Sequence, residues 1–255
     1  MKKILFIDPG EVDLNLNNKL AAFLNTHKGG SIAQVDVVGL PQTPHHLEYY
    51  YYHALIAPSI IEAVYNGERA GYDACVIGCF DDPCLDAARE ICDKMVVTAP
   101  MEACIYTAMT LGSRFSVLVG HSSWIPRMQQ HITYYGGAGK LASFVDLGLG
   151  VTEFQQDPAH TEKLMRQAVE TAIQRDRAEV IILGCTMEFG FYRQLQEIYS
   201  IPILDATLVP LKYAEYLLEL QCCCSWFTSK GGAWATPPKG ELRAWGLQDK
   251  YGIDF

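Results

Sequence analysis

Two short stretches with the same pattern decide the fold, and they read Ala74-Cys75-Val76-Ile77-Gly78-Cys79 and Val180-Ile181-Ile182-Leu183-Gly184-Cys185. Each is a short apolar run, typical of a strand buried on both faces, followed by Gly-Cys and a helical pattern. Each helical pattern leads to a second apolar run, and Val97 and Ile203 both lie 18 residues after the cysteine of their own stretch. With the two cysteines 106 residues apart, the pattern indicates a duplicated βαβα unit.

The same alternation of apolar runs and helical patterns extends over most of the chain. The apolar runs predict strands over residues 4–7, 33–38, 74–78, 94–98, 115–119, 143–147, 180–184 and 202–204. The helical patterns predict helices over residues 15–25, 58–70, 82–93, 101–111, 124–135, 158–175, 188–199 and 207–220. The prediction is an α/β fold with two similar Rossmann-like lobes, each with a parallel sheet. The lobes would be related by a pseudo-two-fold axis, with the active site in the cleft between them.

The repeat also predicts the lobe boundaries. Residues 1–100 together with 208–220 are expected to form the first lobe, which carries Cys79, and residues 101–207 the second, which carries Cys185. Residues 221–255 break the pattern, with three consecutive cysteines and three tryptophans. We expect an irregular Trp/Cys-rich C-terminal extension that packs on its own lobe or on a neighbouring subunit. A lid over the cleft is an alternative.

Composition limits the classes of partner. The 255 residues are 49% hydrophobic and 19% charged, as expected of a globular enzyme, and the formal net charge is −9. An acidic chain is a poor match for nucleic acid or anionic lipid, so a small molecule is the expected ligand. No apolar run approaches the roughly 18 residues of a membrane helix, and no signal peptide is visible. The chain is therefore expected to be cytoplasmic.

The nine cysteines fit neither a disulfide framework nor a zinc site. Their number is odd and no C-x-x-C spacing occurs. Most are expected to be small core residues, and we predict no metal and no cofactor.

Cys79 and Cys185 differ from the other cysteines because each follows a predicted strand and precedes a predicted helix. A helix N-terminus stabilises a thiolate and lowers the thiol pKa. Two such groups suggest two-base chemistry, in which one thiolate removes a proton from carbon and the other thiol returns one to the opposite face. Backbone N–H groups after each cysteine would stabilise the carbanion. One such cysteine alone would be interpreted as a packing residue, but their equivalent places in a repeat favour catalysis.

These motifs resemble those of hydantoin racemases in the aspartate/glutamate/hydantoin racemase superfamily. Gly78–Glu90 is similar to the first cysteine motif and Leu183–Glu188 to the second, while Glu102-Ala103 and Arg114–Val117 match the stretch between them. The resemblance covers roughly residues 1–220. It implies cofactor-independent, metal-free catalysis by Cys79 and Cys185 in two Rossmann-like lobes, usually in a homo-oligomer.

The chain departs from the family pattern beside both predicted strand ends of the first lobe. Asp8-Pro9-Gly10-Glu11 stands where relatives usually carry Asn-Pro-Asn followed by Ser or Thr, and Asp81 stands where Gly is frequent. An acid at Asp8 would repel a substrate carboxylate and accept hydrogen bonds from a ring N–H. The run 45–53, rich in histidine and tyrosine, and the tryptophan-rich tail are also atypical.

Residues at the carboxyl ends of strands are the predicted substrate contacts. They are Asp8, Pro9, Phe80, Asp81, His121, Ser122, Thr186 and Met187. Asp82 is expected to cap the helix that directly follows it.

The leading hypothesis is a cofactor-independent racemase or epimerase acting on a hydantoin-like or amino-acid-like small molecule. A second hypothesis is an isomerase, lyase or hydrolytic enzyme in which a cysteine attacks an unsaturated or heterocyclic substrate. A third is a non-catalytic ligand-binding homologue. The pattern does not distinguish which thiol acts as the base.

Overall fold

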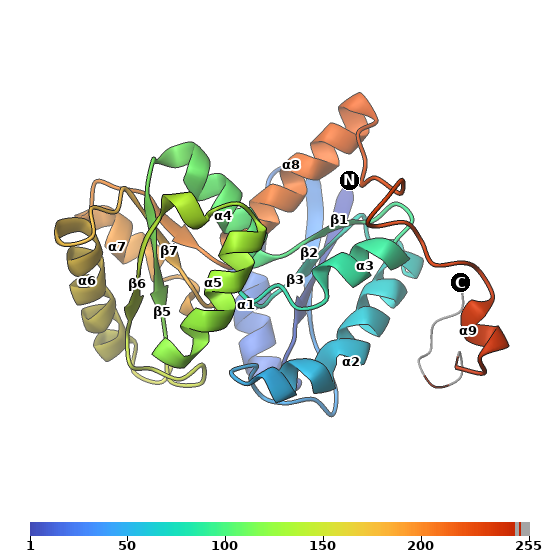
Figure 1. Cartoon of the computed structure of the whole chain (residues 1–255), viewed down its shortest axis with the longest axis horizontal. Coiled ribbons are helices and arrows are strands. Elements are labelled where there is room, and N and C mark those ends of the chain that lie inside the picture. The colour runs from blue at the N-terminus through green and yellow to red at the C-terminus, as the bar shows by residue number, and fades with distance from the viewer. Residues whose placement is uncertain (248–249, 251–255) are drawn as a thin grey trace. The chain divides into compact units, whose positions relative to one another are not determined.

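The computed structural model describes residues 1–247 and 250 and contains two four-stranded parallel sheets (Figure 1). The first has the order β2 (Ile32–Gly39), β1 (Lys2–Asp8), β3 (Ala74–Ile77) and β4 (Val96–Thr98). The second has the order β6 (Leu141–Asp146), β5 (Phe115–Val119), β7 (Val180–Leu183) and β8 (Ile203–Asp205). The two sheets have the same strand order, so the predicted α/β fold and its repeat are confirmed. The pseudo-two-fold relation stays a prediction.

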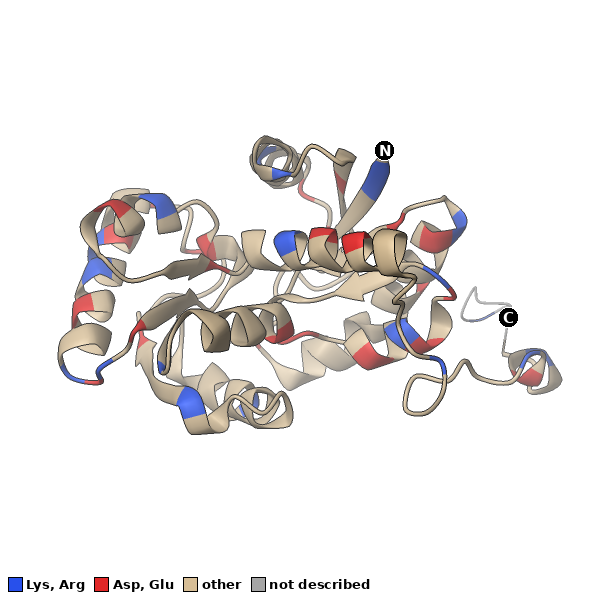
Figure 2. Ribbon diagram, turned by 90° about the horizontal axis from the view of Figure 1, so that it is seen from above, with Lys and Arg blue, Asp and Glu red and all other residues tan. Residues whose placement is uncertain are grey.

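The equivalence extends to the cysteines. In each sheet the third strand, β3 or β7, ends two residues before its cysteine and pairs with the strand that follows the next helix. Strands β3, β5 and β7 contain no charged residue, and in Figure 2 the charges lie mainly on helices and loops. Charge-free strands are expected where helices cover both faces of a parallel sheet.

Nine α-helices are described, together with three short 3₁₀ turns. The helices are α1 (Leu14–His27), α2 (Tyr50–Arg69), α3 (Leu85–Ile91), α4 (Pro100–Leu111), α5 (Ile125–Tyr134), α6 (Pro158–Gln174), α7 (Tyr192–Ile198), α8 (Leu208–Cys224) and α9 (Glu241–Ala244). The turns are η1 (Ser122–Trp124), η2 (Ala138–Lys140) and η3 (Thr186–Glu188).

Helix α2 begins eight residues before the predicted position. Proline favours the first turn of a helix, so the sequence placed the start at Pro58, but Pro58 lies inside the helix. Ile56, Ile60 and Val64 share one face of α2 and are fully buried. We infer that the packing of this apolar face outweighs the backbone hydrogen bond that an internal proline removes.

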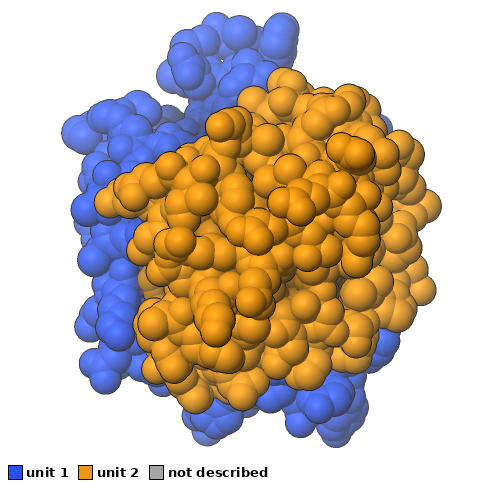
Figure 3. Space-filling view, turned by 90° about the vertical axis from the view of Figure 1, so that its left-hand side faces the viewer, with its two compact units in different colours: residues 1–77, 83–98, 211–255 blue, residues 78–82, 99–210 orange. Residues whose placement is uncertain are grey.

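Contacts divide the chain into two compact units, coloured separately in Figure 3. Unit 1 comprises residues 1–77, 83–98 and 211–255, and unit 2 comprises residues 78–82 and 99–210. The segment 78–82 packs with unit 2 although it follows β3 of the first sheet. Cys79 and Cys185 therefore belong to the same unit, whereas the prediction assigned Cys79 to the first lobe. The predicted separate extension over 221–255 stays a prediction, and its residues 248–249 and 251–255 lie outside the described residues.

Part of the C-terminal segment packs on α3 within unit 1. The Trp234 indole N–H donates to Asp86 at 2.9 Å, and the Arg89 guanidinium lies 4.7 Å from the centre of the Trp234 ring. Lys230 donates to the carbonyl of Glu90 at 3.2 Å. These contacts explain why an irregular segment with several tryptophans is held against its own unit.

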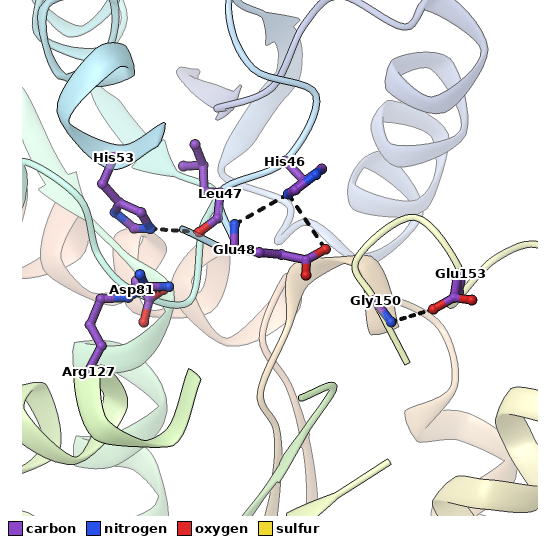
Figure 4. Close-up of polar contacts among 8 residues, drawn as sticks. All are labelled: His46, Leu47, Glu48, His53, Asp81, Arg127, Gly150 and Glu153. Atoms are coloured by element: carbon purple, nitrogen blue, oxygen red, sulfur yellow. Dashed lines mark hydrogen bonds and ion pairs between the residues drawn. The ribbon is translucent and has the colours of Figure 1, made fainter. Parts of the chain in front are cut away.

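Two histidines of the run 45–53 have partners nearby in the chain. His46 lies 3.5 Å from the Glu48 carboxylate, and a His53 ring nitrogen lies 2.9 Å from the Leu47 carbonyl (Figure 4). Tyr49, Tyr50 and Tyr51 are more than half exposed.

No helix among the described residues has the length and apolar character needed to cross a membrane.

Candidate active site

The loop that carries Cys79 is a tight turn anchored by Asp82. The Asp82 N–H donates to the Cys79 carbonyl at 3.0 Å, and Asp82 has a left-handed backbone with φ of 47°. Its carboxylate accepts the N–H groups of Met101 and Glu102, both at 2.7 Å, at the start of α4. Asp82 therefore caps α4 and not the helix directly after it, so that expectation was wrong. This cap also explains why residues 78–82 pack with unit 2.

The loop that carries Cys185 begins with a glycine in a crowded position. A Cβ at Gly184 would lie 2.4 Å from the Leu118 carbonyl oxygen, so no other residue fits without a shift of the backbone. Cys185 then starts the 3₁₀ turn η3, where its sulfur accepts the Glu188 N–H and its own N–H donates to the Glu188 carboxyl at 3.1 Å. Helix α7 begins only at Tyr192, four residues later than predicted, because this turn separates it from Cys185.

A direct hydrogen bond joins the two cysteine loops. The Thr186 hydroxyl donates to the carbonyl of Gly78, the residue before Cys79, at 3.0 Å. Thr207 in turn donates its hydroxyl to the Thr186 carbonyl at 3.0 Å. The two thiols also interact electrostatically, because a charge on Cys79 raises the pKa of Cys185. The structure thus joins the loops that carry the two cysteines predicted to be catalytic.

Both thiols are held in the protonated form by burial, the largest influence on each. Burial raises the pKa of Cys79, the charge of Asp81 raises it further, and the Asp81 N–H and Arg127 lower it. Burial also raises the pKa of Cys185, followed by the charge of Glu188, while the Met187 N–H lowers it. Helix N-termini do not lower the pKa of either thiol, contrary to the prediction, because neither helix starts at its cysteine and desolvation dominates.

Asp81 is neutralised by a residue that the sequence analysis missed. The Arg127 guanidinium on α5 donates through Nε to Asp81 at 2.7 Å and through a second nitrogen to the same oxygen, and Figure 4 shows this pair. The two side chains are only 8% and 6% exposed. The position of Arg127 in the first turn of α5 is a signal for such a pair. A cation there opposes the helix dipole and is stabilised by an acidic partner.

Glu188 is a second buried acid, and it lies beside Cys185. It is 0% exposed, and burial raises the pKa of its carboxyl well above the ordinary value. The Cys185 N–H lowers that pKa, and the charge of Asp205 raises it. One carboxyl oxygen, Oε1, has no hydrogen-bond partner among the described residues. Burial therefore favours the protonated form of the Glu188 carboxyl.

The remaining predicted contacts fall into three groups. Phe80 directly follows Cys79 and is buried in the core of unit 2. Met187 lies two residues after Cys185 and is partly buried against the same core. His121 and Ser122 are exposed at the end of β5, where the Ser122 N–H donates to Asp146 at 2.8 Å.

Asp8 is the last residue of β1 and Pro9 follows it, and both belong to unit 1. Pro9 is buried and Asp8 is half-buried, and burial raises the pKa of Asp8 to about 6, with a smaller contribution from the charge of Asp13. Asp8 lies 3.2 Å from the side-chain amide of Asn17, oriented to donate. Its role as a substrate contact stays a prediction.

Comparison with known proteins gives one consistent result. The family model "Asp/Glu/Hydantoin racemase" matches residues 4–214. A hydantoin racemase of Pseudomonas sp. (strain NS671) is 33% identical over 190 residues, which cover 74% of this chain and 76% of that protein. A hydantoin racemase of Paenarthrobacter aurescens is 35% identical over 189 residues, covering 72% and 76%. An allantoin racemase structure from Klebsiella pneumoniae superposes with a TM-score of 0.86 at 23% identity, covering 96% and 98%.

Proposed function

This chain belongs to the Asp/Glu/hydantoin racemase family, and we propose that it racemises a small molecule with Cys79 and Cys185 as its two proton-transfer groups. The observation that carries the proposal is the hydrogen bond from Thr186 to the Gly78 carbonyl, because it fastens the two Gly-Cys loops to each other. Neither cysteine is a disulfide partner among the described residues.

The proposed reaction needs one negative charge on the pair of thiols. The thiolate removes the proton from a carbon next to a carbonyl group, and the electron pair of that C–H bond is delocalised into the carbonyl. The other thiol then donates its proton to the opposite face of the carbon. At the end the first cysteine is a thiol and the second a thiolate, so the reverse reaction uses the same groups with exchanged roles.

The charges around the thiols favour a neutral substrate. Asp81 and Glu188 are acidic neighbours of the cysteines, and the cation Arg127 is already paired with Asp81. A substrate carboxylate would have to compete with Asp81 for Arg127, whereas a ring that carries N–H and C=O groups could exchange hydrogen bonds with the loops. We therefore propose a hydantoin-type ring, in line with the names of the curated relatives.

Several finer assignments remain proposals that accompany this function. We propose that the backbone of Phe80, Asp81, Thr186 and Met187 contacts the substrate, because these residues follow the two cysteines. Contacts from Asp8, Pro9, His121 and Ser122, a homo-oligomeric state and a cytoplasmic location stay predictions.

The test is racemisation of one enantiomer of a 5-substituted hydantoin, followed by circular dichroism. Cys79→Ser and Cys185→Ser should each reduce the rate at least about a hundredfold, the usual contribution of general acid–base catalysis. Cys104→Ser is the matched control, because Cys104 is buried on α4 of the same unit outside both loops, and it should retain the rate of the parent.

Normal racemisation by both serine variants would contradict the proposal. A covalent substrate adduct on one cysteine, detected by mass spectrometry, would instead support cysteine attack on the ring.

A further inference from the structure

A buried ion pair lies beside the Cys79 thiol. The Arg127 guanidinium donates through Nε to Oδ2 of Asp81 at 2.7 Å, and a second guanidinium nitrogen contacts the same oxygen. A carboxylate oxygen of Asp81 and the Cys79 sulfur lie within 4.8 Å of each other. All three residues belong to unit 2, and both side chains of the pair are buried. A carboxylate at this position is thus held by a cation and lies close to a thiol.

We propose that the Arg127 guanidinium is a carboxylate-binding site that Asp81 fills from within the chain, and that Asp81 thereby excludes substrates with a free carboxylate from the position beside Cys79. This inference rests on the proposed two-thiol racemisation and deepens it, because it names the residue that sets the class of substrate.

The chemistry of the pair is that of a general carboxylate site. A guanidinium presents planar N–H donors in a fork that matches the two oxygens of a carboxylate. A buried guanidinium is also costly to leave without an anion. Removal of the Asp81 carboxylate therefore leaves a cation in need of a partner and a space of carboxylate size next to it. An external carboxylate satisfies both conditions.

The place of this site relative to Cys79 gives it a consequence for specificity. In an acid substrate, the carbon that loses its proton is bonded directly to the carboxyl carbon. A substrate carboxylate in the place of the Asp81 carboxylate would thus put that carbon beside the Cys79 sulfur. Asp81 occupies the position first, because its tether to the Cys79 loop gives it an effective concentration of about millimolar or more. A neutral ring has no need of Arg127 and is not excluded.

The experiment compares two alkylating reagents at Cys79, in the full chain at neutral pH without substrate, with mass mapping of the alkylated peptides. Iodoacetate carries a carboxylate and iodoacetamide is its neutral counterpart, and with each reagent the thiolate sulfur displaces iodide from the same carbon. Both reactions need the thiolate, so the ratio of the iodoacetate rate to the iodoacetamide rate is independent of the pKa and the exposure of the thiol. In the parent we expect iodoacetate to be the slower reagent at Cys79.

Asp81→Ala frees Arg127 and should raise this ratio at Cys79 about 10- to 100-fold, the usual effect of hydrogen bonds to a charged partner. Addition of Arg127→Gln to that variant should abolish the gain. Asp81→Asn removes the same charge but keeps the space filled, so its gain should be clearly smaller than that of Asp81→Ala. The exposed Cys223 of unit 1 is the reference thiol in every chain, and its ratio should not change.

Stability gives a second measurement of the same site. Because an unpaired buried cation destabilises the fold, formate should raise the midpoint of thermal unfolding of Asp81→Ala but not that of the parent, and acetamide should raise neither.

An unchanged reagent ratio in Asp81→Ala would overturn the inference. An equal gain in Asp81→Asn would also overturn it, because the gain would then come from net charge and not from a site for the carboxylate. An Asp81→Ala chain that stays unfolded in formate would count against it in the same way. Because no racemase substrate is involved, these results are separate from any failure of the racemase assay.

Discussion

Replacing Thr186 by valine tests whether the hydroxyl that joins the two cysteine loops matters for chemistry. Valine has nearly the same shape but cannot donate a hydrogen bond, so the Gly78 carbonyl loses the partner it has at 3.0 Å. The loss should reduce the free energy of unfolding by about 1–2 kcal/mol. It also releases the residue before Cys79 from the Cys185 loop. Because a displacement of about 1 Å in a catalytic group costs about a hundredfold in rate, we expect kcat to fall about 10- to 100-fold.

A matched control separates this effect from a general loss of stability. The Thr161 hydroxyl also donates to a backbone carbonyl at 3.0 Å, that of Phe154, and Thr161 is buried in the same unit. Thr161→Val should cost a similar amount in urea unfolding but leave kcat unchanged, and Thr186→Ser should retain both. The assay is racemisation kinetics with a single enantiomer, combined with urea denaturation.

Two results would refute this reasoning. Equal kcat values for Thr186→Val and Thr161→Val would show that the link between the loops does not position Cys79. A higher KM with unchanged kcat in Thr186→Val would show that the hydroxyl contributes to uniform binding of the substrate instead.

Three further predictions concern stability and packing. Folded Asp82 keeps its proton up to a pKa of about 8, while the unfolded chain loses it near about 4, so the free energy of unfolding should fall as the pH rises through this window. Asp82→Asn should make that fall smaller in urea titrations, and an unchanged dependence on pH would contradict this. Gly184→Ala forces a Cβ to 2.4 Å from a carbonyl and should cost about 3 kcal/mol or more, whereas Gly139→Ala, with nothing within 4 Å, should change the midpoint of thermal unfolding little. Trp234→Ala removes the contacts with α3 and should accelerate tryptic cleavage at Lys230. Trp234→Phe keeps an aromatic ring near Arg89 and should retain much of the protection against trypsin. Equal cleavage of both variants would argue against the stacking contact.

The sheets could be predicted because their information is local. Apolar runs in the sequence overlap all eight strands that the structure describes, and the Gly-Cys pair after β3 and β7 indicated the repeat. Parallel sheets are covered on both faces, so such strands consist of continuous apolar residues. The same logic located the two cysteines.

Several features of the site depend on contacts distant in the sequence. Asp82 caps a helix that starts 18 residues later, and Asp81 pairs with Arg127, which lies 46 residues away. The strongest local signal for either contact is Arg127 itself, a cation in the first turn of α5, where it opposes the helix dipole. The direction of the thiol pKa shifts was wrong for the same reason, since desolvation depends on the whole packed unit.

The most direct measurement of the central claim is racemisation of one hydantoin enantiomer in deuterium oxide, stopped at low conversion and corrected for uncatalysed exchange. If Cys79 and Cys185 serve opposite faces of the carbon, the newly formed enantiomer contains solvent deuterium and the remaining starting enantiomer contains none. Equal deuterium in both enantiomers, or a product that retains the original proton, would contradict the account.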